Sequence, residues 1–162
     1  MDISETMLRR ARQTVSTAHP DPPCRVKWLR STGTTFPLRT ASADFICAFS
    51  VFTHMEHEDS DRYLVDALRV VRPDGRFVFS CLPLELDFAR QVFRDSASVS
   101  LSERWSRARN VATSRDFMDA ISELAGWHIV AWHRGDEPTV PLAGINERAA
   151  FGQSICVLER PR

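Results

Sequence analysis

The segment Asp44–Phe52 is apolar at nearly every position, so neither face of a strand formed there would suit water. A strand with one solvated face alternates apolar and polar residues, whereas a strand of a parallel sheet is covered on both faces and is continuously apolar. Arg76–Leu82 has the same character. An amphipathic stripe of helical spacing, from Tyr63 to Val71, separates the two. The sequence therefore predicts a parallel β-α-β unit in a three-layer α/β sandwich.

The rest of the chain is predicted to follow the same alternation. A helix is expected over residues 3–16, two helical pieces over 85–112, a helix over 113–125 that ends at Gly126, and a long loop over 135–152. Within the helix 113–125, the inward-facing side chains are expected to be Phe117, Ile121 and Leu124. Further strands are expected at Arg25–Arg30, Trp127–His133 and Ser154–Glu159, and a turn at Pro73-Asp74-Gly75.

Two features of this pattern concern the last strands. No helix separates Trp127–His133 from Ser154–Glu159, which predicts an antiparallel hairpin at one edge of the sheet. Trp127 and Trp132 are expected on opposite faces of their strand, as packing residues rather than stacking platforms.

Length and charge restrict the organisation and the partners. The 162 residues predict a single domain, residues 1–162. Acidic and basic residues number 21 each, which argues against nucleic acid and against an anionic membrane as partners. The basic run Arg104–Arg109 is therefore interpreted as a solvated helix face.

No stretch resembles a signal peptide or a membrane helix. The four cysteines form no C-x-x-C pair and predict reduced core thiols in a cytoplasmic protein.

The distribution of glycine in the sequence excludes two nucleotide-binding motifs. The six glycines are all at least eight positions apart. A dinucleotide-binding G-x-G-x-x-G turn and a P-loop both need closely spaced glycines, because the backbone must approach phosphate oxygens. Neither motif occurs in this sequence.

An ordered set of short motifs resembles the class I S-adenosylmethionine-dependent methyltransferases. These motifs run through nearly the whole chain in the family's order. They are Asp2-Ile3-Ser4, Met7-Leu8, Ala11-Arg12, Phe36-Pro37-Leu38, Ala43-Asp44-Phe45, Ser50 to Met55, Tyr63-Leu64, Leu68 to Arg76, Ala125-Gly126-Trp127 and the strand Gln153–Leu158.

The resemblance implies a Rossmann-like sheet with strand order 3-2-1-4-5-7-6, in which strand 7 is antiparallel. Asp44–Ser50 corresponds to the fourth strand, Arg76–Leu82 to the fifth, Trp127–His133 to the sixth and Ser154–Glu159 to the seventh. Arg25–Arg30 corresponds to the third. Counterparts of the first strand and its glycine-rich turn are not found, so we expect an incomplete methyltransferase fold that lacks the N-terminal cofactor-binding segment. One edge of the fourth strand would then be bare.

Three residues near the start of the chain are candidate cofactor contacts through the resemblance. Asp2 corresponds to the acid that holds the ribose hydroxyls of S-adenosylmethionine in the family. We favour its other interpretation, a cap for the helix that follows. Thr32 and Gly33 stand where the family usually has an acid near the adenine amino group. The Thr32 hydroxyl could accept the same hydrogen bond, and the alternative for both residues is a plain loop.

Four residues after Asp44–Phe49 form the second group of candidates. Ser50, Val51 and Phe52 fall at the carboxyl end of the predicted sheet, where open α/β folds bind ligands. In the family this segment lines the methionine portion of the cofactor. His54 is the candidate general base, because imidazole titrates near neutrality, although many such enzymes need none. The acids after His54 have no metal-ligand spacing and suit a helix start, so no metal is expected.

These observations lead to three hypotheses. The first is an S-adenosylmethionine-dependent methyltransferase-like protein that acts on a small molecule, or descends from an enzyme that did, with weak or absent binding of the cofactor by this chain alone. The second is a non-catalytic module that pairs through its bare strand edge, as a homodimer or with another chain. The third is an unrelated α/β enzyme that uses His54.

Overall fold

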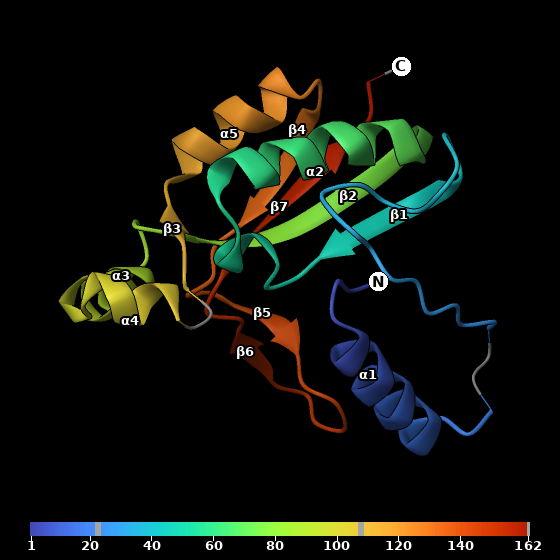
Figure 1. Cartoon of the computed structure of the whole chain (residues 1–162), viewed down its shortest axis with the longest axis horizontal. Coiled ribbons are helices and arrows are strands. Elements are labelled where there is room, and N and C mark those ends of the chain that lie inside the picture. The colour runs from blue at the N-terminus through green and yellow to red at the C-terminus, as the bar shows by residue number, and fades with distance from the viewer. Residues whose placement is uncertain (22–23, 107–108, 162) are drawn as a thin grey trace.

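A mixed sheet forms the centre of the molecule (Figure 1). The computed structural model describes residues 1–21, 24–106 and 109–161. The strands lie in the order β1-β2-β7-β4, with β1 parallel to β2 and β7 antiparallel to both neighbours. Their bounds are β1 Ala43–Ala48, β2 Val71–Pro83, β7 Ser154–Glu159 and β4 His128–His133. The short strand β3, Ala112–Thr113, pairs in parallel with the last two residues of β2.

This order confirms the fold class. The strands that correspond to the family's fourth, fifth, seventh and sixth are neighbours in that sequence, and the two C-terminal strands form the expected antiparallel pair. The chain therefore has an α/β, Rossmann-like methyltransferase fold.

Helices lie on both sides of the sheet (Figure 1). In that view α2 and α5 lie above the sheet, whereas α1 and the small β5–β6 sheet lie below it. The pair β5–β6 falls in the segment expected as a loop. The bounds are α1 Glu5–Ala18, η1 Phe52–His54, α2 His57–Val70, α3 Asp87–Ser98, α4 Leu101–Trp105, α5 Arg115–Leu124, β5 Pro138–Pro141 and β6 Arg148–Ala150.

The core lies between α2 and the sheet. Leu64 of α2 and the rings of Phe77 and Phe79 on β2 are fully buried. Each such side chain contributes about 1.5–3 kcal/mol by leaving water. The Trp127 indole joins the cluster and donates a hydrogen bond to the Leu64 carbonyl oxygen at 2.9 Å. This packing fixes the end of β2 that carries the site described below.

The predicted inward face of α5 is correct only at Ile121, which packs against the core. Phe117 is 38% and Leu124 81% exposed, and the buried positions are Met118 and Ser122. The N-cap of α5 is Ser114, whose hydroxyl accepts a hydrogen bond from the Phe117 N–H at 3.2 Å. The apolar periodicity of a ten-residue helix does not determine to within one residue which side faces the sheet. In the folded protein, packing against the sheet determines that side.

Arg25–Arg30 was expected as a strand, and this prediction is wrong. Within the described residues, its contribution to β-structure is one parallel bridge between Arg30 and Asp2. A strand needs a continuous ladder of pairs with a neighbouring strand, and one bridge does not form such a ladder. Pro22 and Pro23, part of the segment expected to end the first helix, lie outside the described residues, as do Arg107 and Ala108 of the basic run.

The turn predicted at Pro73-Asp74-Gly75 takes the form of a bulge within β2. Ala43 pairs with Val71 and Phe45 with Arg76, so the intervening residues loop out of register. Asp74 has a φ of +63°.

A second register shift corrects the placement of two tryptophans. It lies between Ile129 and Ala131 of β4 and changes the alternation of side chains there. As a result Trp127 and Trp132 both reach the helical layer, Trp127 toward α2 and Trp132 by a bond to Asp119 of α5 at 2.8 Å. Their predicted role in packing is confirmed, but not their placement on opposite faces.

The cysteines divide into two pairs. Cys81 and Cys156 are buried as expected, whereas Cys24 and Cys47 are exposed, which corrects the expectation of four core thiols. Burial raises the pKa of the Cys81 thiol to about 12 and also raises that of Cys156. These two thiols are therefore unreactive at neutral pH. In the described part of the chain, no helix has the length and apolar character needed to cross a membrane.

Candidate functional site

Three side chains join the ends of three strands at the carboxyl end of β1. The Ser50 N–H donates to the Ser80 hydroxyl at 2.8 Å, and that hydroxyl donates to Gln153 Oε1 at 2.7 Å. The Gln153 amide in turn donates to the Ser50 hydroxyl at 2.9 Å. A closed ring of hydrogen bonds therefore positions Ser50 against β2 and the residue that precedes β7.

Ser50 has an unusual backbone conformation. Its φ is +53°, in the left-handed region that few residues other than glycine adopt. Such strain persists where surrounding contacts hold it, and it is found often at ligand sites. Ser50 is exposed, and Val51 beside it is 38% exposed. Phe52 is different, since its ring is buried against Phe77 and Phe79 and serves the core.

His54 is oriented through one ring nitrogen. Its Nδ1 lies 2.8 Å from the Arg109 carbonyl oxygen. A carbonyl oxygen only accepts, so Nδ1 carries the hydrogen, and Nε2 of the neutral ring is the nitrogen able to accept a proton. The side chain is exposed. This tautomer is the one that a general base on an exposed ligand would need.

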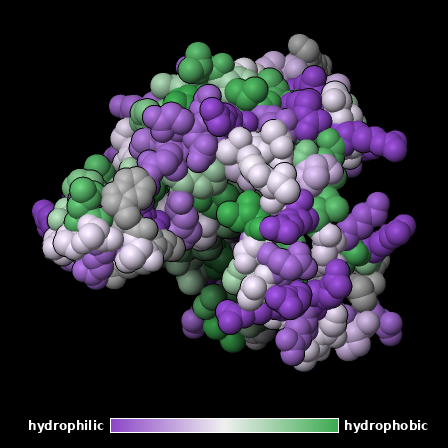
Figure 2. All heavy atoms as spheres, in the orientation of Figure 1, coloured by the Kyte–Doolittle hydropathy of each residue, from purple (hydrophilic) through white to green (hydrophobic). Residues whose placement is uncertain are grey.

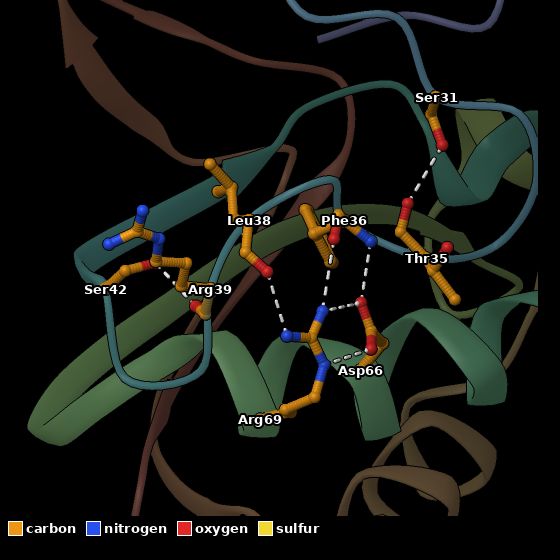
Figure 3. A network of polar contacts seen from close by, with 8 residues as sticks. All are labelled: Ser31, Thr35, Phe36, Leu38, Arg39, Ser42, Asp66 and Arg69. Carbon is orange, nitrogen blue, oxygen red and sulfur yellow. Dashed lines mark hydrogen bonds and ion pairs between the residues drawn. The ribbon is translucent and has the colours of Figure 1, made fainter.

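The loop between residues 31 and 39 is hydrogen-bonded to two residues of α2, Asp66 and Arg69, which form an ion pair with each other (Figure 3). Asp66 Oδ2 accepts from the Phe36 N–H at 2.6 Å, and Arg69 donates to both Asp66 oxygens at 2.7 and 3.0 Å. Arg69 also donates to the carbonyl oxygens of Phe36 and Leu38. Burial acts to raise the pKa of Asp66, but the bonds from Arg69 and Phe36 outweigh it and lower that pKa.

The same loop carries Thr32 and Gly33. Both are exposed. The Gly33 carbonyl oxygen accepts from the Tyr63 hydroxyl at 3.0 Å and from the Ser31 hydroxyl at 2.8 Å. A Cβ added at Gly33 would meet no atom within 4 Å, so this point of the loop faces open space.

Asp2 acts in local structure. Its carboxylate accepts from the Ser4 N–H at 2.7 Å, and the Ser4 hydroxyl accepts from the Met7 N–H as the N-cap of α1. The cap predicted at Asp2 is thus two residues later. Backbone bonds place Asp2 between Leu29 and Ser31, directly before Thr32.

The candidates therefore fall into separate local groups. Asp2 adjoins the loop of Thr32 and Gly33, Ser50 is tied to Ser80 and Gln153, and His54 is tied to Arg109. Sequence reasoning missed Ser80, Gln153, Asp66 and Arg109, because each acts through a partner at least thirty positions away, except for the Asp66–Arg69 contact at helical spacing. Across the described ranges, no three His, Cys, Asp or Glu side chains cluster closely enough to hold a metal ion.

Comparison with known proteins agrees with this architecture. Residues 1–79 match the family described as "Methyltransferase domain". No curated protein sequence matches the chain.

Solved structures match over almost the full chain. A SAM-dependent methyltransferase from Thermotoga maritima has a TM-score of 0.69 at 17% identity, covering 98% of this chain and 71% of that one. Magnesium protoporphyrin IX methyltransferase from Synechocystis, with bound SAH, has a TM-score of 0.67 at 14% identity and coverages of 98% and 62%. A Haloferax volcanii methyltransferase in complex with the Trm112 activator has a TM-score of 0.65 at 17% identity and coverages of 99% and 70%. At these identities the likeness establishes the fold.

Proposed function

We propose that this chain, which has the fold of the class I S-adenosylmethionine-dependent methyltransferases, is a methyltransferase-like protein of the cytoplasm whose ancestral or present acceptor is a small molecule. The observation that carries the proposal is the strand order β1-β2-β7-β4 together with a strained, exposed Ser50 at the carboxyl end of β1. The match of residues 1–79 to the methyltransferase domain and the solved neighbour with bound SAH support it.

The proposed cofactor contacts are those that the family resemblance implies. Gly33 and Thr32 would face the adenine, Asp2 the ribose, and Ser50 and Val51 the methionine portion. S-adenosylmethionine, when bound, would supply an electrophilic methyl group. His54 would accept a proton from the acceptor at Nε2 while its Nδ1–H stays on the Arg109 carbonyl oxygen.

The residues present fit the cofactor only in part. The Ser50 N–H, which points from the end of β1, already donates to Ser80. The sequence offers no pair of close glycines where the backbone could approach a carboxylate or ribose. We therefore propose weak or absent cofactor binding, and correspondingly weak or absent methyl transfer, by the isolated chain.

Calorimetric titration with S-adenosylhomocysteine tests the affinity. The expected Kd is no tighter than about 100 µM, because few backbone donors remain to hold the ligand's polar groups. Adenosine alone is the matched control and is expected to bind no more than about tenfold more weakly, since the proposed adenine contacts are the more complete ones. A Kd near 1 µM would contradict the proposed weakness.

An alternative function is a non-catalytic module that pairs through β1. Within the described residues β1 has a strand partner on one side only, and Phe45 is 57% and Phe49 46% exposed. An uncovered apolar edge strand is a template for pairing. The solved neighbour in complex with an activator protein supports a partner chain as the occupant of this edge. Light scattering distinguishes the two, since a clean monomer of the wild type argues against self-pairing and a dimer abolished by F45K supports it.

A further inference from the structure

A cavity beside the candidate site is lined by Arg104, whose Nε has no hydrogen-bond partner among the described residues. The cavity has a volume of about 520 Å³ and lies between α3, α4 and residues 109–112. Its wall is continuous with the site, because the Val111 N–H donates to the Thr53 carbonyl oxygen at 2.8 Å and the Arg109 carbonyl oxygen contacts His54. A ligand in this cavity would therefore lie next to η1. The volume is within the range of about 300–1,000 Å³ typical of small-molecule sites.

The charged side chains that line the cavity differ in the hydrogen bonds and ion pairs that they form. Arg109 forms an ion pair with Glu56. Asp95 is exposed and accepts a hydrogen bond from the Gln91 amide at 2.7 Å. Arg104 is partly buried, and its Nε is buried with no hydrogen-bond partner in the described part of the chain. An unsatisfied donor on a buried charged group is costly. Because Arg104 also lines the cavity, an acceptor brought by a ligand to its guanidinium would offset part of that cost.

We propose that the cavity binds a small organic acid, with its carboxylate on the Arg104 guanidinium and its apolar body against Val92, Phe93 and Val111. A guanidinium binds a carboxylate through parallel, charge-assisted hydrogen bonds, which gives both strength and orientation. The apolar residues on the same wall select an acid with a hydrocarbon or aromatic body over a small inorganic anion. That this acid is the methyl acceptor rests on the proposed function; its binding does not.

The test uses the full chain without cofactor and a pair of probes of equal size. Calorimetry or ligand-observed NMR is performed with 2-naphthoate and with 2-naphthamide, its uncharged counterpart. We expect the acid to bind at least about tenfold more tightly than the amide. We expect R104Q to weaken the acid by a similar factor and leave the amide unchanged. The matched control is R94Q, which removes an exposed arginine from α3 outside the cavity and is expected to change neither.

The outcomes separate this proposal from the proposed function. Equal binding of acid and amide, no binding of the acid at millimolar concentration, or acid binding that R104Q leaves intact would each overturn it. If R104Q fails to fold, R104K keeps the charge but not the paired donors and is expected to weaken the acid less. A Kd near 1 µM for S-adenosylhomocysteine would contradict the weak cofactor binding proposed above and would leave the acid site standing.

Discussion

Replacing Gly135 with alanine is expected to lower the free energy of unfolding by about 2–3 kcal/mol, as for an overpacked core position. A Cβ there would lie 2.5 Å from the carbonyl carbon of Gln153 and 2.7 and 2.8 Å from its backbone nitrogen and oxygen. Backbone atoms cannot rotate away as a flexible side chain could. The backbone of Gly135 is also hydrogen-bonded on both sides, because its N–H donates to the Ser154 hydroxyl and its carbonyl oxygen accepts from the Gly152 N–H. The clash must therefore move the segment that carries Gln153.

This substitution also has a local consequence. Because the Gln153 side chain closes the ring with Ser50 and Ser80, its displacement should change the amide resonance of Ser50 in the NMR spectrum. Urea denaturation measures the loss of stability. The control is G33A, where an added Cβ meets nothing within 4 Å, and the expected change is within about 0.5 kcal/mol. If G135A and G33A were equally stable, the proposed close packing of these two segments would be wrong.

Replacing Asp66 with asparagine is expected to lower the free energy of unfolding by about 2–3 kcal/mol, because charged hydrogen-bond partners are left incomplete. The Asp66 side chain is only 14% exposed and binds both the Phe36 N–H and Arg69 (Figure 3). The matched control is D44N. Asp44 pairs with Arg72 at 2.6 Å, but its side chain is 80% exposed. Solvent screens such a pair, so the expected loss is below about 1 kcal/mol.

The effect of D66N should depend on pH in a defined direction. The folded-state pKa of Asp66 is lowered from its usual value of 3.8, chiefly by Arg69 and Phe36 acting against burial. Its stabilising contribution is therefore complete above that usual value and is lost as the pH falls through the lowered one. Denaturation at pH 7 should show the full difference between wild type and D66N, and denaturation near pH 3 a smaller one. A difference that grows on acidification would contradict this assignment.

Apolar patterns predicted the positions of β1 and β2 and their parallel pairing. The expectation that both faces of β1 are covered is wrong, because Phe45, Cys47 and Phe49 are exposed on one face of this edge strand. The resemblance added the strand order, which periodicity alone does not contain. Errors arose where a shift of one residue in the strand or helix pattern decides which face a side chain occupies. The bulge between Ile129 and Ala131 moved Trp132 to the helical layer, and the rotation of α5 exposed Leu124.

The candidate site was predicted less completely for a different reason. Ser50 and His54 could be proposed from their place after a buried strand. Their partners could not, since Gln153 lies 103 positions from Ser50, and Arg109 lies 55 from His54. Such pairs arise only once the sheet brings the ends of its strands together. Arg104 was interpreted as part of a solvated helix face, because the burial of its Nε cannot be read from a run of basic residues.

Figure 2 shows apolar side chains in the recess between the part of the molecule that carries α2 and the lower part that carries α1 and β5–β6. Some exposed apolar area on the sheet belongs to Phe45 and Phe49. We nevertheless propose that ligand binds at the carboxyl end of β1, because Ser50 there is exposed with a strained backbone and the exposed ring of His54 close after it is oriented by Arg109.

The most direct test of this central claim is an amide chemical-shift titration of the ¹⁵N-labelled chain with S-adenosylhomocysteine at millimolar concentration. We expect shifts at Gly33, at Ser50–His54 and at Ser80, with none at the opposite end of the sheet, where Asp74 and Glu159 serve as internal controls. Shifts confined to that opposite end would contradict ligand binding at the carboxyl end of β1, and saturation at micromolar ligand would contradict the proposed weak binding.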